Sequence, residues 1–281
     1  MSPDSIAQSA QLAMLLELSS SPKPGNVDRC HDHPDIGFHH FLASAVLVYP
    51  VFRRAAQGQE GLGRLIREAV SVWREWGLDG NTHFGEITLL MPLAAAAGRG
   101  GLLEEEVARV LECTTVEDSS QFYRAFAMAG ARVAEVGQFS LQDEGAAEEV
   151  ARQGKTLLEL MKLSRGHDLV AREWATGCAH SFMLSDILMQ ECEARDLNDA
   201  VVVTFLRALA AGQDSLVRSK FGEARAREVS SLAKSALSAP DILASAREMD
   251  LHLLQQDINP GSTADLIGAA LFISLHRGLK F

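Results

Sequence analysis

Apolar residues recur every three or four positions along most of the chain. In residues 62–76, for example, Leu62, Leu65, Ala69 and Trp73 fall on one face of a helix. Residues 147–161 follow the same template. Residues 200–205 are rich in β-branched side chains but continue into a helical pattern, and no alternating run bounded by turn residues is found. The pattern therefore predicts an all-α fold.

Proline and glycine interrupt this helical pattern at a few places. We expect loops where turn-forming residues gather, at residues 21–26, 77–81, 98–101 and 259–262. Pro50 and Pro92 lie inside apolar helical patterns, where each is expected to end or kink its helix. No linker is long or polar enough to separate domains. We therefore expect a single large multi-helix domain over residues 1–281.

The composition excludes some partners and locations. The 281 residues carry 37 acidic and 26 basic side chains, a net charge of −11, without a basic run that could neutralise a row of phosphates. We expect no nucleic-acid partner, although a few converging basic groups or a metal could still hold a polyphosphate. The N-terminal segment lacks a basic region, and apolar stretches such as residues 87–97 fall short of the ~20 residues of a membrane span. The four cysteines are scattered, as expected for reduced thiols in a cytosol. We therefore expect a soluble cytoplasmic protein without a membrane partner.

The first segment with chemical potential covers residues 20–29, which read SSPKPGNVDR. Its two prolines fix φ and lower the entropy of the free loop, so Lys23 and Asp28 can be presented in one geometry. By composition alone, an ordinary surface turn followed by a polar loop explains the segment equally well.

The second segment covers residues 79–86, which read DGNTHFGE and lead into the apolar residues 87–97. Asn81 or Thr82 can cap the helix that follows. The helix N-terminus offers backbone N–H groups and the positive end of the dipole, and Gly85 allows an anion to approach closely. Simple capping, with His83 as a surface side chain, is the structural alternative.

The third segment covers residues 257–265, which read DINPGSTAD and precede residues 266–275, apolar nearly all round and so expected to be buried. A buried helix N-terminus needs partners for its N–H groups, either from Ser262, Thr263 and Asp265 or from a bound anion. Asp265 lies three residues after Ser262, which also suggests a capping box. The two interpretations are compatible, and both stay open.

Two further clusters are weaker. Residues 214–222 (DSLVRSKFG) place Arg218 and Lys220 near an acid, and residues 164–173 (SRGHDLVARE) do likewise, but surface ion pairs explain both equally well. Neither a Walker loop nor a dinucleotide fingerprint is present. Together, the Gly/Asn turns at helix starts, the scattered acids and the lone basic residues indicate a metal-assisted polyphosphate site on an unfamiliar scaffold.

Three segments in combination resemble the signature of a known enzyme family. Residues 22–28 (PKPGNVD), 81–85 (NTHFG) and 259–266 (NPGSTADL) look like the three signature segments of triphosphoribosyl-dephospho-CoA synthases, in the family's order. Residues 214–222 resemble a fourth, fainter segment. The resemblance implies a helical enzyme that transfers the 5-triphosphoribosyl group of ATP to the 2′-hydroxyl of dephospho-CoA and releases adenine.

The resemblance also implies a set of site residues, and we expect the loops at 23–28, 81–86 and 259–265 to converge on one pocket. Breaking the N-glycosidic bond builds positive charge at C1 of the ribose, which a carboxylate should stabilise while another group takes the hydroxyl proton. Three adjacent phosphates need charge compensation, so Mg²⁺ is the expected cofactor. The candidates are Asp28, Asp265 and His83 for catalysis, Asp28, Asp265 and Glu86 for metal binding, and Lys23, Gly25, Asn26, Asn81, Gly85, Arg218, Lys220, Asn259, Gly261 and Ser262 for substrate binding.

The chain also departs from the family pattern. Phe84 stands where the family often has lysine, so a phosphate contact is missing, and Glu86 stands where a small or apolar residue is usual. Variants near residues 25–27, 34–38 and 164–173 look closer to the archaeal and methylotroph branch, for which a related pentosyl transfer to a hydroxyl in tetrahydromethanopterin biosynthesis is a rival.

Two other classes of function stay open. One is a metal-dependent nucleotide hydrolase that uses the histidines and acids His31, Asp32, His33 and His83. The other is a helical nucleotide-binding module without turnover. The sequence predicts neither the acceptor, the oligomeric state nor the number of metal ions.

Overall fold

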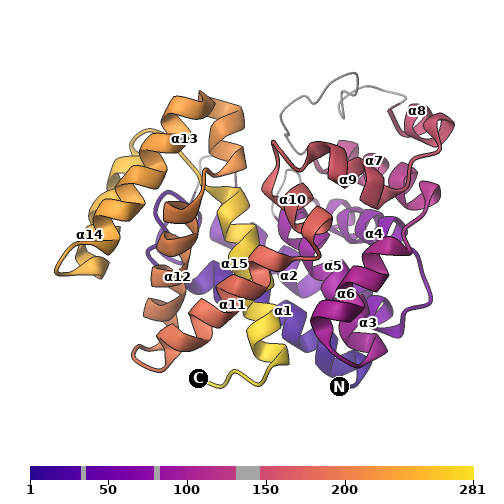
Figure 1. Ribbon diagram of the computed structural model, residues 1–281, viewed down its shortest axis with the longest axis horizontal. Coiled ribbons are helices and arrows are strands. Elements are labelled where there is room, and N and C mark those ends of the chain that lie inside the picture. The colour runs from indigo at the N-terminus through magenta and orange to yellow at the C-terminus, as the bar shows by residue number, and fades with distance from the viewer. Residues whose placement is uncertain (33–35, 79–82, 131–145) are drawn as a thin grey trace. The chain divides into compact units, whose positions relative to one another are not determined.

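A computed structural model describes residues 1–32, 36–78, 83–130 and 146–281, and the statements below refer to these residues. They form fifteen helices, α1 to α15, and contain one isolated β-bridge between Asp28 and His31 but no strand (Figure 1). The prediction of an all-α fold is confirmed.

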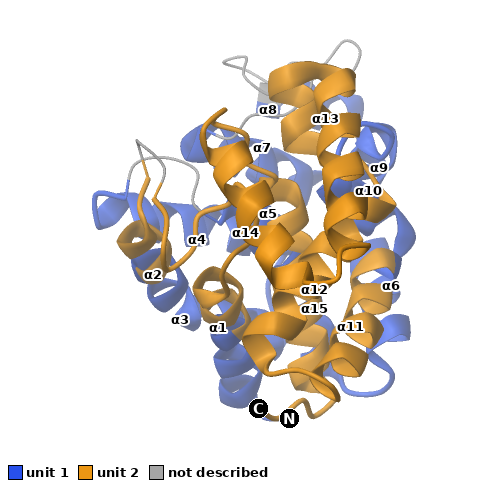
Figure 2. Ribbon diagram, turned by 90° about the vertical axis from the view of Figure 1, so that its left-hand side faces the viewer, with its two compact units in different colours: residues 1–12, 43–179 blue, residues 13–42, 180–281 orange. Residues whose placement is uncertain are grey.

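The chain divides into two compact units, which we describe separately (Figure 2). Unit 1 contains residues 1–12 and 43–179, and unit 2 contains residues 13–42 and 180–281. The division falls within helices α1 (Pro3–Ser19) and α2 (Phe38–Leu47), and after the first residue of α11 (Ala179–Cys192). The single domain expected from the sequence stays a prediction.

Unit 1 is built around α5, an apolar helix. Its other complete helices are α3 (Tyr49–Gln57), α4 (Leu62–Glu75), α6 (Leu103–Glu112), α7 (Val116–Ala129), α8 (Ala146–Gln153), α9 (Leu157–Ser164) and α10 (Leu169–Thr176). Helix α5 (Phe84–Arg99) contacts α3, α4, α6 and α10, and its residues 86–97 are all buried because no face of it is polar. Pro92 lies inside α5, which continues past it.

Unit 2 is built around α15 (Gly261–His276), whose residues 266–274 are all buried, as the sequence predicted. Its other helices are α11 (Ala179–Cys192), α12 (Leu197–Ala211), α13 (Ser215–Leu237) and α14 (Ile242–Leu254). Helix α12 packs against α13, α14 and α15, and α13 packs against α14 and α15. The start of α15 is therefore fixed among helices rather than displayed on a loop.

Two proline and glycine positions set helix boundaries. Helix α3 starts at Tyr49 with Pro50 in its first turn, so Pro50 begins a new helix, as expected for proline there. The helical pattern over residues 147–161 is interrupted, because Gly154 adopts a φ of 65° and ends α8. Helix α9 then begins with a capping box formed by Thr156 and Glu159.

Helices α12 and α13 follow one another across a short break at residues 212–214. Among the described residues, no single helix is long and apolar enough to cross a membrane. By length and composition, α12 and α13 pass that test only as a pair, bent by 51° at the break between them.

Candidate functional site

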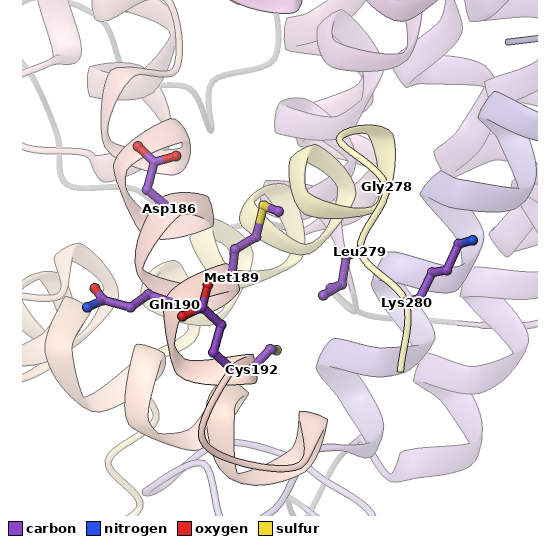
Figure 3. Close-up of a pocket in the computed structure, with 8 residues that line it drawn as sticks. Asp186, Met189, Gln190, Cys192, Gly278, Leu279 and Lys280 are labelled. Carbon is purple, nitrogen blue, oxygen red and sulfur yellow. The ribbon is translucent and has the colours of Figure 1, made fainter.

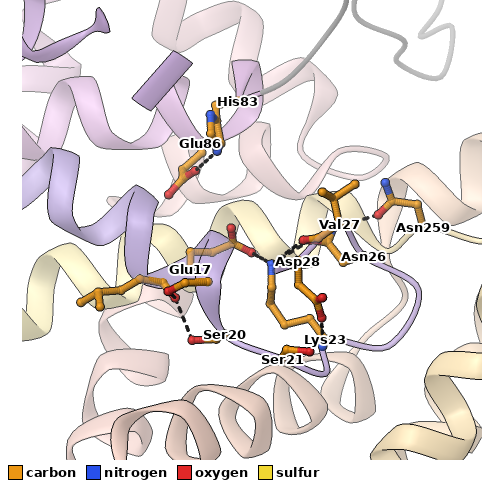
Figure 4. A network of polar contacts seen from close by, with 12 residues as sticks. Glu17, Ser20, Ser21, Lys23, Asn26, Val27, Asp28, His83, Glu86 and Asn259 are labelled. Atoms are coloured by element: carbon orange, nitrogen blue, oxygen red, sulfur yellow. Dashed lines mark hydrogen bonds and ion pairs between the residues drawn. The ribbon is translucent and has the colours of Figure 1, made fainter. Parts of the chain in front are cut away.

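Lys23 is the centre of a buried polar network in unit 2 (Figure 4). Its Nζ donates hydrogen bonds to Glu17 Oε1 at 2.5 Å, Asn26 Oδ1 at 2.9 Å and the Val27 carbonyl oxygen at 3.1 Å. An ammonium group has three N–H donors, so these partners use all of them. Burial raises the pKa of the Glu17 carboxyl, and the neighbouring Lys23 ammonium opposes that shift. Contact between Lys23 and a phosphate would therefore have to replace one of these bonds.

Asp28 lies five residues further along and is fully buried. Its Oδ1 accepts a hydrogen bond from the Cys30 N–H at 2.7 Å, and its Oδ2 accepts one from the Lys23 N–H at 3.3 Å. The backbones of Asp28 and His31 exchange two hydrogen bonds of 3.2 Å, which close a tight turn. The Nδ1 atom of His31 lies 3.6 Å from Asp28 Oδ1. The carboxylate is thus held inside its own loop, next to an imidazole that is 32% exposed.

The loop at residues 22–28 meets the loop at residues 259–265 inside unit 2. Asn26 Nδ2 donates a hydrogen bond of 2.8 Å to Asn259 Oδ1 (Figure 4). Gly25 adopts a φ of 76°, and a Cβ atom there would lie 2.2 Å from the carbonyl oxygen of Ile258. Only glycine permits this approach, because a side chain would collide with the backbone and strain φ. Two of the three loops predicted to converge therefore lie together.

The start of α15 is capped by a residue that lies 49 positions earlier in the chain. Asp214 Oδ2 accepts hydrogen bonds from the Thr263 N–H and Oγ1, both at 2.7 Å. Asp214 Oδ1 accepts from the N–H groups of Leu216 and Val217, at 2.9 and 3.0 Å, and so also caps α13. Burial raises the pKa of Asp214, while these four donors act in the opposite direction.

This arrangement corrects the interpretation of residues 262–265 as a capping box. Helix α15 begins at Gly261 with Pro260 at the N-cap position, so Ser262 already lies inside the first turn. Ser262 Oγ instead accepts a hydrogen bond of 2.9 Å from Ser215 Oγ. Asp265, on the next turn of α15, is half-buried. A nonlocal carboxylate therefore occupies the place predicted for a local cap or an anion.

The predicted phosphate ligands of α13 differ in exposure. Arg218 is half-buried one turn after Asp214. Lys220 is exposed, two residues before Gly222, where a φ of 83° kinks α13. Gly261, the first residue of α15, lies close to α13, since an added Cβ there would be 3.0 Å from Leu216 Cδ2. Residues 214–216 therefore pack against the start of α15, which a purely surface interpretation of that cluster did not anticipate, whereas residues 219–222 are exposed.

In unit 1, His83 and Glu86 lie together at the start of α5. His83 occupies the N-cap position, and its Nδ1 lies 2.6 Å from Ser44 Oγ, while its Nε2 lies 3.6 Å from Glu86 Oε2 (Figure 4). Trp73 Nε1 donates a hydrogen bond of 3.0 Å to the carbonyl oxygen of Ser44. His83 is only 3% exposed, so the interpretation of it as a surface side chain was wrong. Gly85 is half-buried in the first turn.

One predicted site residue of this segment, Asn81, lies outside the described residues, as does His33. The joining of this segment to the two loops of unit 2 stays a prediction. Some of the predicted residues lie together within each unit: Asn26 and Asn259 in unit 2, and His83 and Glu86 in unit 1.

Sequence reasoning missed two buried acids of unit 2, Glu17 and Asp250. Asp250 Oδ1 accepts a hydrogen bond of 2.8 Å from the Gly25 N–H. Burial raises the pKa of Asp250, against the effect of that donor. Both acids interrupt the apolar face of a helix. Glu17 lies one turn from the buried residues Ala13 and Met14, and Asp250 lies one turn from Ala246 and Leu253. That interruption is the signal that could have identified them.

A separate surface pocket of about 530 Å³ also lies in unit 2, beside α11 and the C-terminal residues (Figure 3). It is lined by Asp186, Met189, Gln190, Cys192, Glu193, Gly278, Leu279 and Lys280. None of these residues belongs to the signature segments, so the pocket forms no part of the candidate site.

The described geometry defines an all-helical protein in which two signature segments from opposite ends of the chain meet in unit 2 beside a buried polar network. Comparison with known proteins gives the family. The model of the ATP:dephospho-CoA triphosphoribosyl transferase family matches residues 3–280. The chain belongs to this family of enzymes, in agreement with the resemblance found in the signature segments.

Individual relatives agree with that assignment. A protein of Pseudomonas putida named "Probable 2-(5''-triphosphoribosyl)-3'-dephosphocoenzyme-A synthase" is 27% identical, over 96% of this chain and 94% of its own length. A protein of Albidiferax ferrireducens with the same name is 25% identical, over 96% and 90% of the two chains.

A solved structure is also similar. A crystallised protein of Archaeoglobus fulgidus with the provisional name triphosphoribosyl-dephospho-CoA synthase superposes with a TM-score of 0.71 and 28% identity, over 85% of this chain and all of that one. This neighbour is archaeal, but placement of the present chain in the archaeal and methylotroph branch stays a prediction.

Proposed function

We propose that this chain transfers the 5-triphosphoribosyl group of ATP to the 2′-hydroxyl of dephospho-CoA and releases adenine. The family match over residues 3–280 supports the reaction. The structural observation that supports a site for it is the hydrogen bond between Asn26 and Asn259, which joins two signature loops separated by 233 residues. Such joining is expected where one ligand is held by both loops.

The proposed reaction forms one bond and breaks one bond at C1 of the ribose. The acceptor oxygen bonds to C1, the bond from C1 to the adenine nitrogen breaks, and the proton of the acceptor hydroxyl is passed on until adenine leaves neutral. Positive charge develops at C1, so a nearby carboxylate stabilises the transition state. We assign Asp28 and Asp265 to this role or to the base, and His83 to adenine or proton contact. Direct displacement would give an α linkage.

The triphosphate needs cationic partners. We assign Arg218 and Lys220 to it, together with Lys23 if one bond of its buried network is exchanged. The carboxylate oxygens of Asp28, Asp265 and Glu86 are hard donors of the kind that suits Mg²⁺, so the residues present fit this ion in their chemistry. Bound Mg²⁺ would neutralise part of the phosphate charge.

Two finer points accompany the proposal. A cytoplasmic location is supported by the use of ATP and by four cysteines that form no disulfide within the described residues. A rival acceptor, a hydroxyl of the tetrahydromethanopterin pathway, would use the same donor chemistry. The choice between acceptors is therefore built into the test.

The test measures adenine release from ATP by the purified chain. We expect release that depends on both dephospho-CoA and Mg²⁺, and that stops when the metal is chelated and returns when Mg²⁺ is restored. Release with a different hydroxyl acceptor but not with dephospho-CoA would select the rival transferase. Phosphate release without adenine would indicate a hydrolase, and binding of ATP without either product would indicate a binding module.

Replacement of the two proposed catalytic acids tests the residue assignments. We expect Asp28→Asn and Asp265→Asn each to lower turnover by roughly two to four decades, because Asn keeps the size but loses the charge. The matched control is Asp196→Asn, whose side chain caps α12 by accepting from the Asp199 N–H, a role that Asn also fills. Near-wild-type turnover removes that residue from the mechanism, and a collapsed melting temperature assigns it to structure.

A further inference from the structure

Asp250 has no role in the chemistry proposed above, yet its carboxylate is among the most deeply buried in unit 2. It lies near the end of α14 and is 2% exposed. A carboxylate in such a place costs free energy unless strong partners compensate for the lost water. Its partners therefore show what its burial achieves.

Both carboxylate oxygens of Asp250 point to the loop at residues 23–31, which contains most of the first signature segment and the turn that follows it. Oδ1 accepts the 2.8 Å hydrogen bond from the Gly25 N–H. Oδ2 lies 3.4 Å from His31 Nδ1. Gly25 and His31 stand near the two ends of this loop, and Asn26 and Asp28 lie between them. One carboxylate from a distant helix thus spans the loop.

The backbone at Gly25 explains why the loop needs this partner. Its φ of 76° turns the N–H toward α14, and the residue packs so closely that an added Cβ would lie 2.9 Å from Leu253 Cβ and 2.2 Å from the Ile258 oxygen. Water cannot easily replace the acceptor in a contact this tight, so loss of Asp250 would leave a buried N–H without a partner.

We propose that Asp250 is a positioning residue that holds the loop at residues 23–31 in the conformation in which Asn26 and Asp28 can act. It acts through Gly25 and His31 and touches no reacting atom. This inference rests on the proposed function only for its effect on turnover. Its effect on the loop itself can be measured without any substrate.

The test compares Asp250→Asn and Asp250→Ala by amide hydrogen exchange and by kinetics. In Asp250→Ala, we expect the peptide that covers residues 22–31 to exchange roughly five-fold to a hundred-fold faster, the scale for loss of one buried hydrogen bond. Asp250→Asn should show a smaller increase, because its amide oxygen can still accept from Gly25. Peptides from α12 should exchange as in the wild type.

Kinetics distinguish positioning from a purely structural role. We expect kcat to fall by about ten-fold to a hundred-fold in Asp250→Ala, because small misplacements of reacting groups are costly, and the Asn variant should recover part of this loss. The matched control is Asp241→Asn, the same change at the N-cap of the same helix, where the side chain accepts from the Ala244 N–H. It should leave exchange at residues 22–31 and turnover unchanged.

Several outcomes would overturn the inference. Unchanged exchange at residues 22–31 in Asp250→Ala would show that the loop does not depend on this carboxylate. Faster exchange throughout the chain in both variants would assign Asp250 to global stability. Faster loop exchange with unchanged kcat would remove the link to catalysis. If the wild type releases no adenine, the proposed function fails, whereas the exchange experiment still decides the effect of Asp250 on its loop.

Discussion

Helices α5 and α15 are both apolar and buried but begin in different ways. Each begins within a signature segment that contains Asn and Gly, and each is buried on nearly all sides in its own unit. The start of α15 is held by Asp214, a carboxylate from the start of another helix. The start of α5 carries His83 and Glu86, an acid and an imidazole only three residues apart.

The difference shows that two similar segments can have unlike roles. At α15, the carboxylate of Asp214 accepts hydrogen bonds from the N–H and the hydroxyl of Thr263, and Asn259, just before the helix, makes the contact between loops. At α5, two ionisable side chains lie buried 3.6 Å apart, and clusters of buried ionisable groups are common at functional sites. We therefore regard the cap of α15 by Asp214 as structural, with the proposed catalytic residue Asp265 on the turn that follows it, and the buried pair at the start of α5 as chemical.

The largest expected effect tests the structural half of this comparison. Asp214→Ala leaves three backbone N–H groups and the Thr263 hydroxyl without their acceptor, at the starts of both α13 and α15. We expect the free energy of unfolding to fall by about 3 to 5 kcal/mol, the sum of two lost caps in a buried place. Urea-induced unfolding followed by circular dichroism measures it.

The matched control is Ser262→Ala, which removes the residue first suspected as the local cap of α15. It loses one hydrogen bond, from Ser215 Oγ, and should cost less than about 1 kcal/mol. If Ser262→Ala destabilises the protein as much as Asp214→Ala, the start of α15 is capped locally after all and the comparison with α5 collapses.

A smaller effect is expected at the start of α5, where Ser44 contacts the imidazole of His83. Ser44→Ala removes the partner of Nδ1, and we expect a loss of about 1 to 2 kcal/mol in unfolding free energy. If the buried pair at the start of α5 acts in catalysis, kcat should fall by more than the fraction of protein that becomes unfolded at the assay temperature. Steady-state adenine release and thermal unfolding are measured on the same preparation.

The control for this variant is Ser71→Ala on α4. The Ser71 hydroxyl donates to the carbonyl oxygen of Arg67, four residues earlier on its own helix, so its removal should be nearly neutral. Equal changes in both serine variants would show that the contact between Ser44 and His83 has no special role.

The sequence was sufficient for the helices because helix formation here follows local periodicity. The buried faces of α4 and α15 coincide with the apolar positions read from the chain. Gly154 was misjudged for a related reason: the apolar spacing continues across it, but its positive φ ends α8. Spacing alone cannot reveal a backbone conformation that only the folded chain requires.

The candidate site was predictable only where its contacts are local. Lys23, Asn26 and Asp28 were found because they share one short segment, whereas the cap by Asp214 and the support by Asp250 link residues that are 49 and 225 positions apart. A sequence motif contains no information about which distant side chain will satisfy its backbone. The burial of Lys23 was missed for the same reason, since Glu17 is its partner on the preceding helix.

The smallest change in unfolding free energy is expected at a charge cluster of unit 1 that lies at neither helix start. This cluster shows how much a partly exposed ion pair contributes to stability. Arg54 donates to both oxygens of Glu60, at 2.7 and 2.5 Å, and also pairs with Glu68. The guanidinium of Arg54 holds the pKa of the Glu60 carboxyl below its usual value. The folded state therefore binds fewer protons than the unfolded state, and the stabilisation is complete above about pH 4.3 and is lost as pH falls toward the folded pKa.

We expect Glu60→Gln to be less stable than the wild type by about 1 kcal/mol or less at pH 6, because the pair is partly exposed. The difference should begin to narrow below about pH 4.3 and vanish as the pH falls through the lowered folded-state pKa, below which folded Glu60 is protonated and resembles Gln. Urea titrations at several pH values measure it, and Glu228→Gln, from a more exposed pair with Arg225, is the control with the smaller expected difference. A difference that stays constant across this pH range would mean that Glu60 stabilises unit 1 through packing rather than through its charge. The cluster could then no longer serve as the measure of an exposed ion pair against which the buried charged groups at the starts of α5 and α15 are compared.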